Sequence, residues 1–108
     1  MNFDNFTIKA QQALQQAIDR AQQNGQQAIT PVHLLAGVLA VGENVTQFVF
    51  GKMGVNEHAL QAAVNSELQR QPRVSGGGSP YLDQEANDVV TRAQSIASKG
   101  GDSYVGLE

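Results

Sequence analysis

Apolar residues recur at helical spacing near the start of the chain. Thr7 precedes this stripe as a residue whose side chain can cap a helix, and Gly25 follows it as a left-handed residue that can end one. Steps of three and four residues place the stripe on a single face, which predicts an amphipathic helix. The stripe consists of Ala10, Ala13, Leu14, Ala17, Ile18 and Ala21.

A second helix is predicted to begin at Thr30. Thr30 followed by Pro31 is a typical helix start, because proline at the first helical position has no amide hydrogen to satisfy. This helix is expected to stop at Gly42. The residues that it is expected to bury are Leu34, Leu35, Val38 and Leu39.

Two more helices are predicted before the chain reaches Pro72. One runs from Val45 to Met53 and stops at Gly54. The apolar residues that it presents are Val45, Phe48, Val49 and Met53. The other is capped by Asn56 and ends before Pro72, because proline cannot continue a helix. It is expected to turn inward Leu60, Ala63, Val64 and Leu68. No segment alternates with period two for long enough to predict a strand, so the fold class is all-α.

Residues 72–80, PRVSGGGSP, form the one clear linker. A Gly/Ser run of this kind buries too little surface to offset its ordering entropy. It also lacks the preceding strand and the following Lys-Ser/Thr that a phosphate-binding loop requires. The predicted organisation is a first four-helix repeat over 1–71, the linker over 72–80, and the start of a second repeat over 81–108.

The pattern of the first helix restarts after the linker. A shift of 76 residues lays Asp83 on Thr7, so that one N-cap residue replaces another. The same shift lays Ala86 on Ala10, Val89 on Ala13, Val90 on Leu14, Ala93 on Ala17, Ala97 on Ala21, Gly101 on Gly25 and Val105 on Ile29. We therefore predict one helical unit that has been duplicated.

The second copy is expected to be incomplete. In the same register Glu108 falls on Val32, inside the second helix. We expect the natural protein to continue past Glu108. Otherwise part of the apolar stripe on the fifth helix must find cover in the first repeat or in another copy.

Charge and composition exclude several classes of protein. The net charge is −3, and the 7 Lys and Arg residues are scattered singly. Nucleic-acid binding needs clustered cations, so no nucleic-acid partner is expected. Cysteine is absent, which excludes disulfides, thiolate nucleophiles and cysteine-based metal sites. The first residues lack the features of a signal peptide, and no apolar run approaches the ~20 residues that span a bilayer. We expect a cytoplasmic protein without a membrane partner.

Three segments carry a family likeness. FTIKA at 6–10, Gly25, and ITPVHLL at 29–35 resemble the first half of the Clp amino-terminal repeat domain. Residues 1–20 and ELQRQPRVSGG at 67–77 are most similar to the ClpB-type branch, the ATP-dependent protein disaggregases. The protease-partner branches, ClpA and ClpC, are more distant.

The resemblance implies a pseudo-twofold domain of two four-helix repeats, with the second truncated here. In the family such domains are tethered above an ATP-driven homohexameric ring, bind unfolded or aggregated protein, and help pass it to the central pore. ATP and magnesium would be held by ATPase modules absent from this chain, so no cofactor is expected in it. The parent protein would also work with an Hsp70-type chaperone system.

The resemblance also marks candidate substrate-binding residues. Thr7 matches a threonine linked to substrate handling, although its plain role is an N-cap worth about 1 kcal/mol. Asp102 and Glu108 match acidic residues beside the fifth and sixth helices, and their plain role is helix electrostatics, worth roughly 0.3–1 kcal/mol. Ile96 matches one groove leucine of the family, whereas Arg92 stands at the position of another.

The remaining candidates are apolar. Ile96, Tyr104 and Leu107 are expected at the edge of the surface that the second repeat would complete. Val105 is expected in the core between the repeats.

The two histidines do not predict a metal site, because such a site needs several converging ligands. His33 is expected to be packed or helix-terminal, and His58 to be solvated. No nucleophile and base accompany the acidic residues, so the chain is not expected to be an enzyme.

The favoured function is weak binding of unfolded chain. Three or four apolar side chains would each gain about 1.5–3 kcal/mol on burial. Ordering a disordered segment takes back about 2–5 kcal/mol, which leaves dissociation constants in the micromolar to millimolar range. The alternatives are an adaptor-docking domain of a protease-associated Clp unfoldase and a purely structural spacer.

Overall fold

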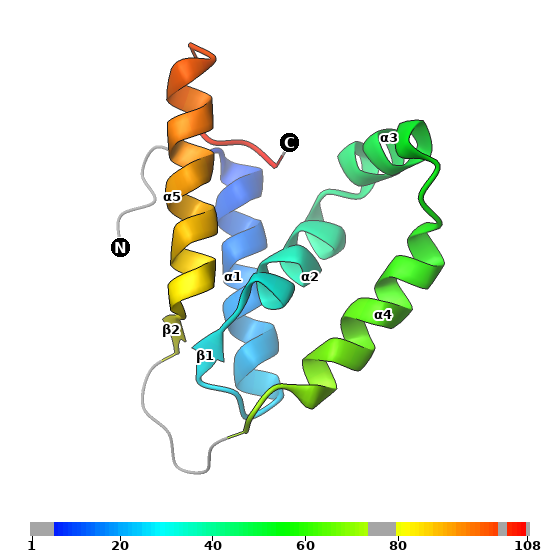
Figure 1. Ribbon diagram of the computed structural model, residues 1–108, viewed down its shortest axis with the longest axis vertical. Helices are drawn as coiled ribbons and strands as arrows, with labels where there is room; N and C mark the ends of the chain where they lie inside the picture. The colour runs from blue at the N-terminus through cyan, green and yellow to red at the C-terminus, as the bar shows by residue number, and fades with distance from the viewer. Residues whose placement is uncertain (1–5, 74–79, 102–103, 108) are drawn as a thin grey trace.

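The computed structural model describes residues 6–73, 80–101 and 104–107, apart from the side chains at 43–45 and 98 (Figure 1). In this part of the chain, five helices and two very short strands follow one another, and the all-α prediction is confirmed. The elements are α1 (Ile8–Gln23), β1 (Ala28–Ile29), α2 (Pro31–Val41), α3 (Glu43–Met53), α4 (Glu57–Arg70), β2 (Tyr81–Leu82) and α5 (Gln84–Lys99).

The helices form two groups around α2. In Figure 1, α1 and α5 stand beside each other and run in opposite directions, while α3 and α4 lie on the other side of α2. One part of the core fills the space between α1 and α5 and contains Phe6, Ala10, Leu14, Val90 and Val105. A second cluster continues along α1 and contains Ala17, Ala21 and Ile29. A third joins α2 to α4 and contains Leu39, Val64 and Leu68.

The predicted caps are present. Thr7 Oγ1 accepts a hydrogen bond from the Ala10 amide at 3.1 Å. Asn56 Oδ1 does the same for Ala59 at 3.1 Å, and Pro31 is the first residue of α2. These bonds satisfy amides that have no partner within the helix, which explains why the helices begin at these residues.

The prediction that the chain has no strand was wrong for four residues. β1 and β2 pair in parallel, with Ala28 opposite Tyr81 and Ile29 opposite Leu82. A two-residue strand is too short to leave a period-two pattern in the sequence. Its main-chain pairing depends on where α1 ends and α5 begins, which is a tertiary feature.

Some residues on the predicted apolar faces are exposed or only partly buried. Ala63 is exposed, and Phe48 and Met53 are each 67% exposed. Leu34, Leu35, Val38, Val49 and Leu60 are only partly buried. α3 also begins at Glu43 rather than at Val45. The side chain of Val45 is not among those that the structure describes. α3 lies at the margin of the molecule, where it packs on α2, so helical spacing alone overstates the burial on it.

The duplication is visible in the backbone. α1 and α5 are both 16 residues long and are offset by 76 residues at both ends. Asp83 Oδ1 accepts from the Ala86 amide at 2.8 Å, as Thr7 does for Ala10. The glycines that follow the two helices, Gly25 and Gly101, have φ of +69° and +82°.

The two copies are joined by reciprocal main-chain bonds. The Thr7 amide donates to the Val105 carbonyl at 2.8 Å, and the Asp83 amide donates to the Ile29 carbonyl at 2.9 Å. Under the 76-residue shift these two bonds are the same bond with the copies exchanged. The pseudo-twofold relation predicted from the sequence therefore holds in the described residues.

Because the two caps are equivalent, their removal should cost similar amounts. Thr7→Ala and Asp83→Ala are each expected to lower the free energy of unfolding by about 1 kcal/mol, measured by urea denaturation. Ser95→Ala, at an exposed position inside α5, is the control and should cause no loss. An unchanged stability in Asp83→Ala would contradict the assigned cap.

Within the described residues, no single helix is long and apolar enough to span a bilayer. Pro31–Val41 and Thr46–Met53 pass such a test together on length and composition, with a bend of 110° between them. The core helix of a globular domain passes the same test, and α2 packs between α1 and α4.

Candidate functional site: an apolar groove between the two copies

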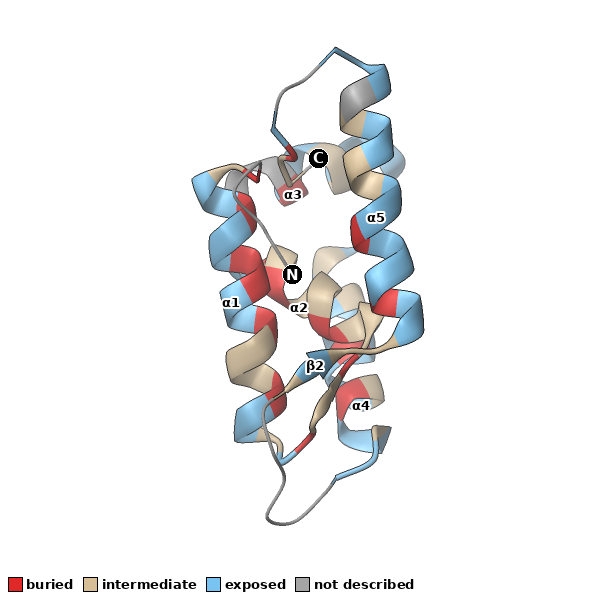
Figure 2. Ribbon diagram, turned by 90° about the vertical axis from the view of Figure 1, so that its left-hand side faces the viewer, coloured by how far each residue is buried: buried red, intermediate tan, exposed pale blue. Residues whose placement is uncertain are grey.

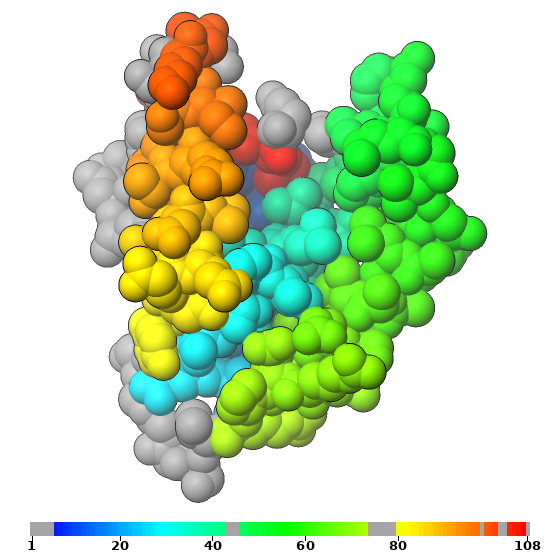
Figure 3. All heavy atoms as spheres, in the orientation of Figure 1, coloured from blue at the N-terminus to red at the C-terminus, as the bar shows by residue number. Residues whose placement is uncertain are grey.

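A groove lies where α1, α2, α5 and the C-terminal segment meet. Its volume is about 150 Å³. Figure 3 shows the surface hollowed between α5 and α2, with the C-terminal segment at the back. All described residues that line it are apolar: Phe6, Ala10, Ala13, Leu14, Leu34, Val38, Val89, Val90, Ala93, Val105, Gly106 and Leu107.

Small side chains in the duplicated stripe leave this space open. Ala10, Ala13 and Ala93 face the groove with one methyl group each. The bridge between Phe6 and Val105 lies at one end and fixes the C-terminal segment against the start of α1. Figure 2 shows the buried positions of α1 and α5 on the sides that face each other.

Leu107 is the one predicted site residue that lines the groove. It is partly buried, and its Cδ1 atom lies close to Gly42 at the end of α2. A Cβ atom added to Gly42 would stand 2.7 Å from that carbon, so the Leu107 side chain would have to shift to make room for it. The sequence contains no signal for this contact.

The other predicted site residues lie elsewhere. Thr7 caps α1 and is bonded to Val105, which lines the groove, but does not line it itself. Ile96 and Tyr104 are 64% and 58% exposed and do not line the groove. Asp102 and Glu108 lie outside the described residues.

Three residues of α5 line the groove but were not predicted as site residues. Val90 is buried, Ala93 is partly buried and Val89 is 49% exposed at the margin. The 76-residue shift already placed all three on the stripe of the first helix. That repeat was the available signal, because a duplicated stripe needs a partner surface.

Two polar hollows lie between α2 and α4. Their volumes are about 210 and 340 Å³, and both include Leu39, Ala40 and Gln61. Arg20 donates to Asn65 Oδ1 at 2.7 Å beside the first. Glu57 and His58 line the second. Their mixed lining favours water, whereas the groove between the copies favours apolar groups.

Neither histidine belongs to the groove. His33 is fully buried at the start of α2 and His58 is exposed, as predicted for both. Among the described residues, no three His, Cys, Asp or Glu side chains converge as metal ligands.

The fold and the groove together define a class: a helical domain built from a duplicated unit, with an apolar groove at the seam of the two copies. The chain belongs to the Clp repeat (R) N-terminal domain family, whose profile matches residues 5–108.

Curated relatives cover the entire chain. It is 48% identical over 108 residues to the chaperone protein ClpB of Bacteroides thetaiotaomicron, and 47% identical to that of Porphyromonas gingivalis. The match covers 100% of this chain but only 12% of each relative. The chain thus spans about an eighth of the length of these relatives.

Solved structures share the fold. The Hsp104 N-terminal domain from Candida albicans superposes with a TM-score of 0.85 at 22% identity, covering 96% of this chain and 69% of that one. The N-terminal domain of the ClpV1 ATPase from E. coli gives a TM-score of 0.86 at 25% identity, covering 95% of this chain and 63% of that one.

Proposed function

We propose that this domain binds unfolded or aggregated polypeptide weakly through the groove between α1 and α5. The observation that carries the proposal is the apolar lining of a hollow of about 150 Å³ at the seam of the duplication. A hollow of that size and lining holds about one phenyl-sized group. Large apolar side chains are mostly buried in folded proteins and become exposed in unfolded ones.

Weak binding follows from the small size of the groove. Each apolar side chain contributes about 1.5–3 kcal/mol, and ordering the segment takes back about 2–5 kcal/mol. One side chain in the groove is therefore not enough, and two or three more would pack on the surface around it, at Ile96 and Tyr104. The dissociation constant for one domain would then lie between micromolar and millimolar. Several tethered copies would raise the avidity through effective concentration, while each contact remains easy to release.

The wider role is part of the same proposal. The longer protein would be an ATPase chaperone, with magnesium and ATP in its other modules, that assembles as a homohexamer in the cytoplasm. This domain would deliver bound chain to the pore, and an Hsp70-type chaperone system would act with the parent protein. Support comes from the relatives that are named chaperone protein ClpB.

Thr7, Ile96, Asp102, Tyr104, Leu107 and Glu108 remain proposed contacts for the bound chain. Leu107 would touch it directly, because it lines the groove. Thr7 would act by holding the start of α1 next to Phe6. Ile96 and Tyr104 would contact segments that extend beyond the groove.

A charge introduced by substitution at the margin of the groove tests the proposal. Val89→Asp is expected to raise the dissociation constant for a permanently unfolded protein at least tenfold, because the carboxylate would lose water when apolar chain covers it. Val89 is half exposed, so the fold should tolerate the change. Isothermal titration calorimetry measures the effect.

Thr91→Asp is the matched control, since it adds the same charge at an exposed position of α5 that does not line the groove. Its dissociation constant should change less than twofold. Equal weakening by the two variants would show that net charge, and not the groove, governs binding. Unchanged binding in Val89→Asp would reject the groove as the site.

A further inference from the structure

His33 is fully buried at the start of α2 and takes no part in the groove. The Thr30 amide donates a hydrogen bond to its Nδ1 atom at 3.0 Å. Its Nε2 atom lies 2.7 Å from Gln26 Oε1. Both ring nitrogens are therefore engaged inside the protein.

These contacts determine where the proton lies. A main-chain N–H can only donate, so Nδ1 must be the acceptor and carry no hydrogen. The ring is then neutral, with its proton on Nε2, which donates to Gln26 Oε1. This orients the Gln26 amide, whose Nε2 donates to the Leu68 carbonyl at 2.6 Å and the Gln71 carbonyl at 3.3 Å.

A single relay thus joins three parts of the chain. It runs from Thr30 through His33 and Gln26 to the carbonyls at the C-terminal end of α4. Nearer the middle of α4, a second polar tie runs from Arg20 to Asn65. The end of α4 depends on the relay and on the buried side chain of Leu68.

Protonation would break this arrangement. A charged imidazole carries hydrogens on both nitrogens, so the new N–H at Nδ1 would face the Thr30 amide, which is also a donor. Thr30 Oγ1, at 2.9 Å, can accept from that N–H, but the amide then loses its partner. A buried cation also needs water, which the ring can reach only by leaving its place.

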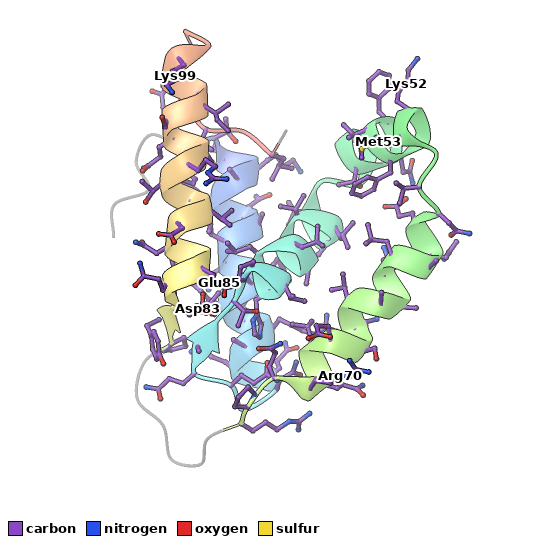
Figure 4. The ribbon with its side chains drawn as sticks, viewed as in Figure 1. Lys52, Met53, Arg70, Asp83, Glu85 and Lys99 are labelled. Atoms are coloured by element: carbon purple, nitrogen blue, oxygen red, sulfur yellow. The ribbon has the colours of Figure 1, made fainter. Side chains whose placement is uncertain are left out.

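The charged groups around the ring shift the pKa of His33 in opposite directions. Burial lowers the pKa of His33 below its usual value, and Arg20 on α1 lowers it further. Asp83, at the foot of α5 (Figure 4), raises it. The charged residues at the end of α4, Glu67 and Arg70, pair with each other at 3.6 Å on the solvent-exposed side of the helix.

We propose that the relay through His33 is a latch that holds the end of α4 at neutral pH and releases it in mild acid. Movement of the charged ring removes the donor from Gln26 Oε1, and Gln26 then no longer holds Leu68 and Gln71. Release of α4 uncovers Leu39, Val64 and Leu68, the cluster that joins it to α2. In acid the domain gains a second apolar surface, separate from the groove.

The pH window follows from linkage. In the unfolded chain the His33 side chain takes up a proton near pH 6.5, the ordinary pKa of histidine. In the latched state protonation needs a lower pH. The latch is therefore at full strength above about pH 6.5 and weakens as the pH falls below that value.

Hydrogen exchange of the 108-residue chain between pH 7.5 and 5.0 tests the proposal. The protection factors of amides in 64–71 are expected to fall at least tenfold relative to those in 13–21 on α1. His33→Gln removes the titrating group, so its relative protection should not change with pH. His58→Gln is the matched control at an exposed histidine and should retain the full response.

Three results would overturn the latch. They are a constant protection ratio in the native chain, a parallel loss in α1 and α4, or an undiminished response in His33→Gln. If His33→Gln does not fold, NMR of the native chain decides instead. The His33 ring and the Leu68 amide must then titrate with one midpoint, and separate midpoints would reject the coupling.

Discussion

Replacing Gly37 by alanine is expected to lower the free energy of unfolding by about 1–3 kcal/mol. A Cβ atom at Gly37 would overlap the main-chain oxygen of Ala13 and stand 3.0 Å from its carbonyl carbon. It would also stand 3.3 Å from the Ala17 nitrogen. These are backbone atoms of α1, so the two helices would have to move apart.

Gly51 provides a matched control, because it also lies inside a helix and a Cβ atom there would meet nothing within 4 Å. Alanine forms helix more readily than glycine, so Gly51→Ala should stabilise the domain by about 0.5–1 kcal/mol. Urea denaturation of both variants measures the contrast. Stabilisation by Gly37→Ala would contradict the close crossing of α1 and α2.

Leu68→Ala is expected to cost about 2–5 kcal/mol, because Leu68 is fully buried and its loss would leave a cavity between α2 and α4. Leu68→Met conserves most of the volume and should cost less than about 1.5 kcal/mol. Chemical denaturation with circular dichroism gives both values. A loss below 1 kcal/mol in Leu68→Ala would show that the third cluster contributes little to the fold.

Leu68→Ala also separates stability from binding. Leu68 belongs to the cluster between α2 and α4 and does not line the groove. Under conditions in which the variant is still folded, its affinity for an unfolded protein should equal that of the native chain. Weaker binding by the folded variant would place the binding surface nearer α4.

Local signals in the sequence were enough to predict where most of the helices begin and end. Thr7, Asn56 and Asp83 are capping residues with side-chain oxygens, and each begins a helix as its chemistry predicts. Gly25 and Gly101 adopt the left-handed conformation that follows from their lack of a side chain. Such features involve residues three or four positions apart, so they can be read along one segment.

The contacts between segments could not be predicted from local patterns in the sequence. Gly37 and Leu34 both lie on an apolar helix, and nothing in their spacing says that the glycine is where α2 meets the backbone of α1. The relay from His33 to Gln26 and Leu68 joins residues 7 and 42 positions apart. Such pairs arise from tertiary packing, which the spacing of residues along one sequence does not specify.

The groove was partly predictable. The repeat indicated that the stripe of α5 needs cover in the first repeat or in another copy, and the structure packs Val90 of α5 with Ala10 and Leu14 of α1. Leu107 was predicted as an edge residue. Ile96 lies on the flank of α5 instead, three positions from Ala93, and is largely exposed. A helical stripe broad enough for a core extends over more than 100°, so its margin cannot be placed from periodicity alone.

The duplication explains why the groove lies at the seam. Each copy contributes one long helix with small residues in its stripe, and the reciprocal bonds Thr7–Val105 and Asp83–Ile29 hold the copies together at their ends. Between these ties the facing stripes include alanine where larger residues would fill the space. An apolar hollow follows from that arrangement of side chains.

NMR titration of the isotope-labelled 108-residue chain with a permanently unfolded protein tests the groove most directly. The largest amide shifts are expected at Ala10, Val89, Ala93 and Leu107, with a dissociation constant between micromolar and millimolar. Shifts concentrated on the outer, glutamine-rich side of α1, or around the polar hollows between α2 and α4, would contradict binding at the seam of the two copies.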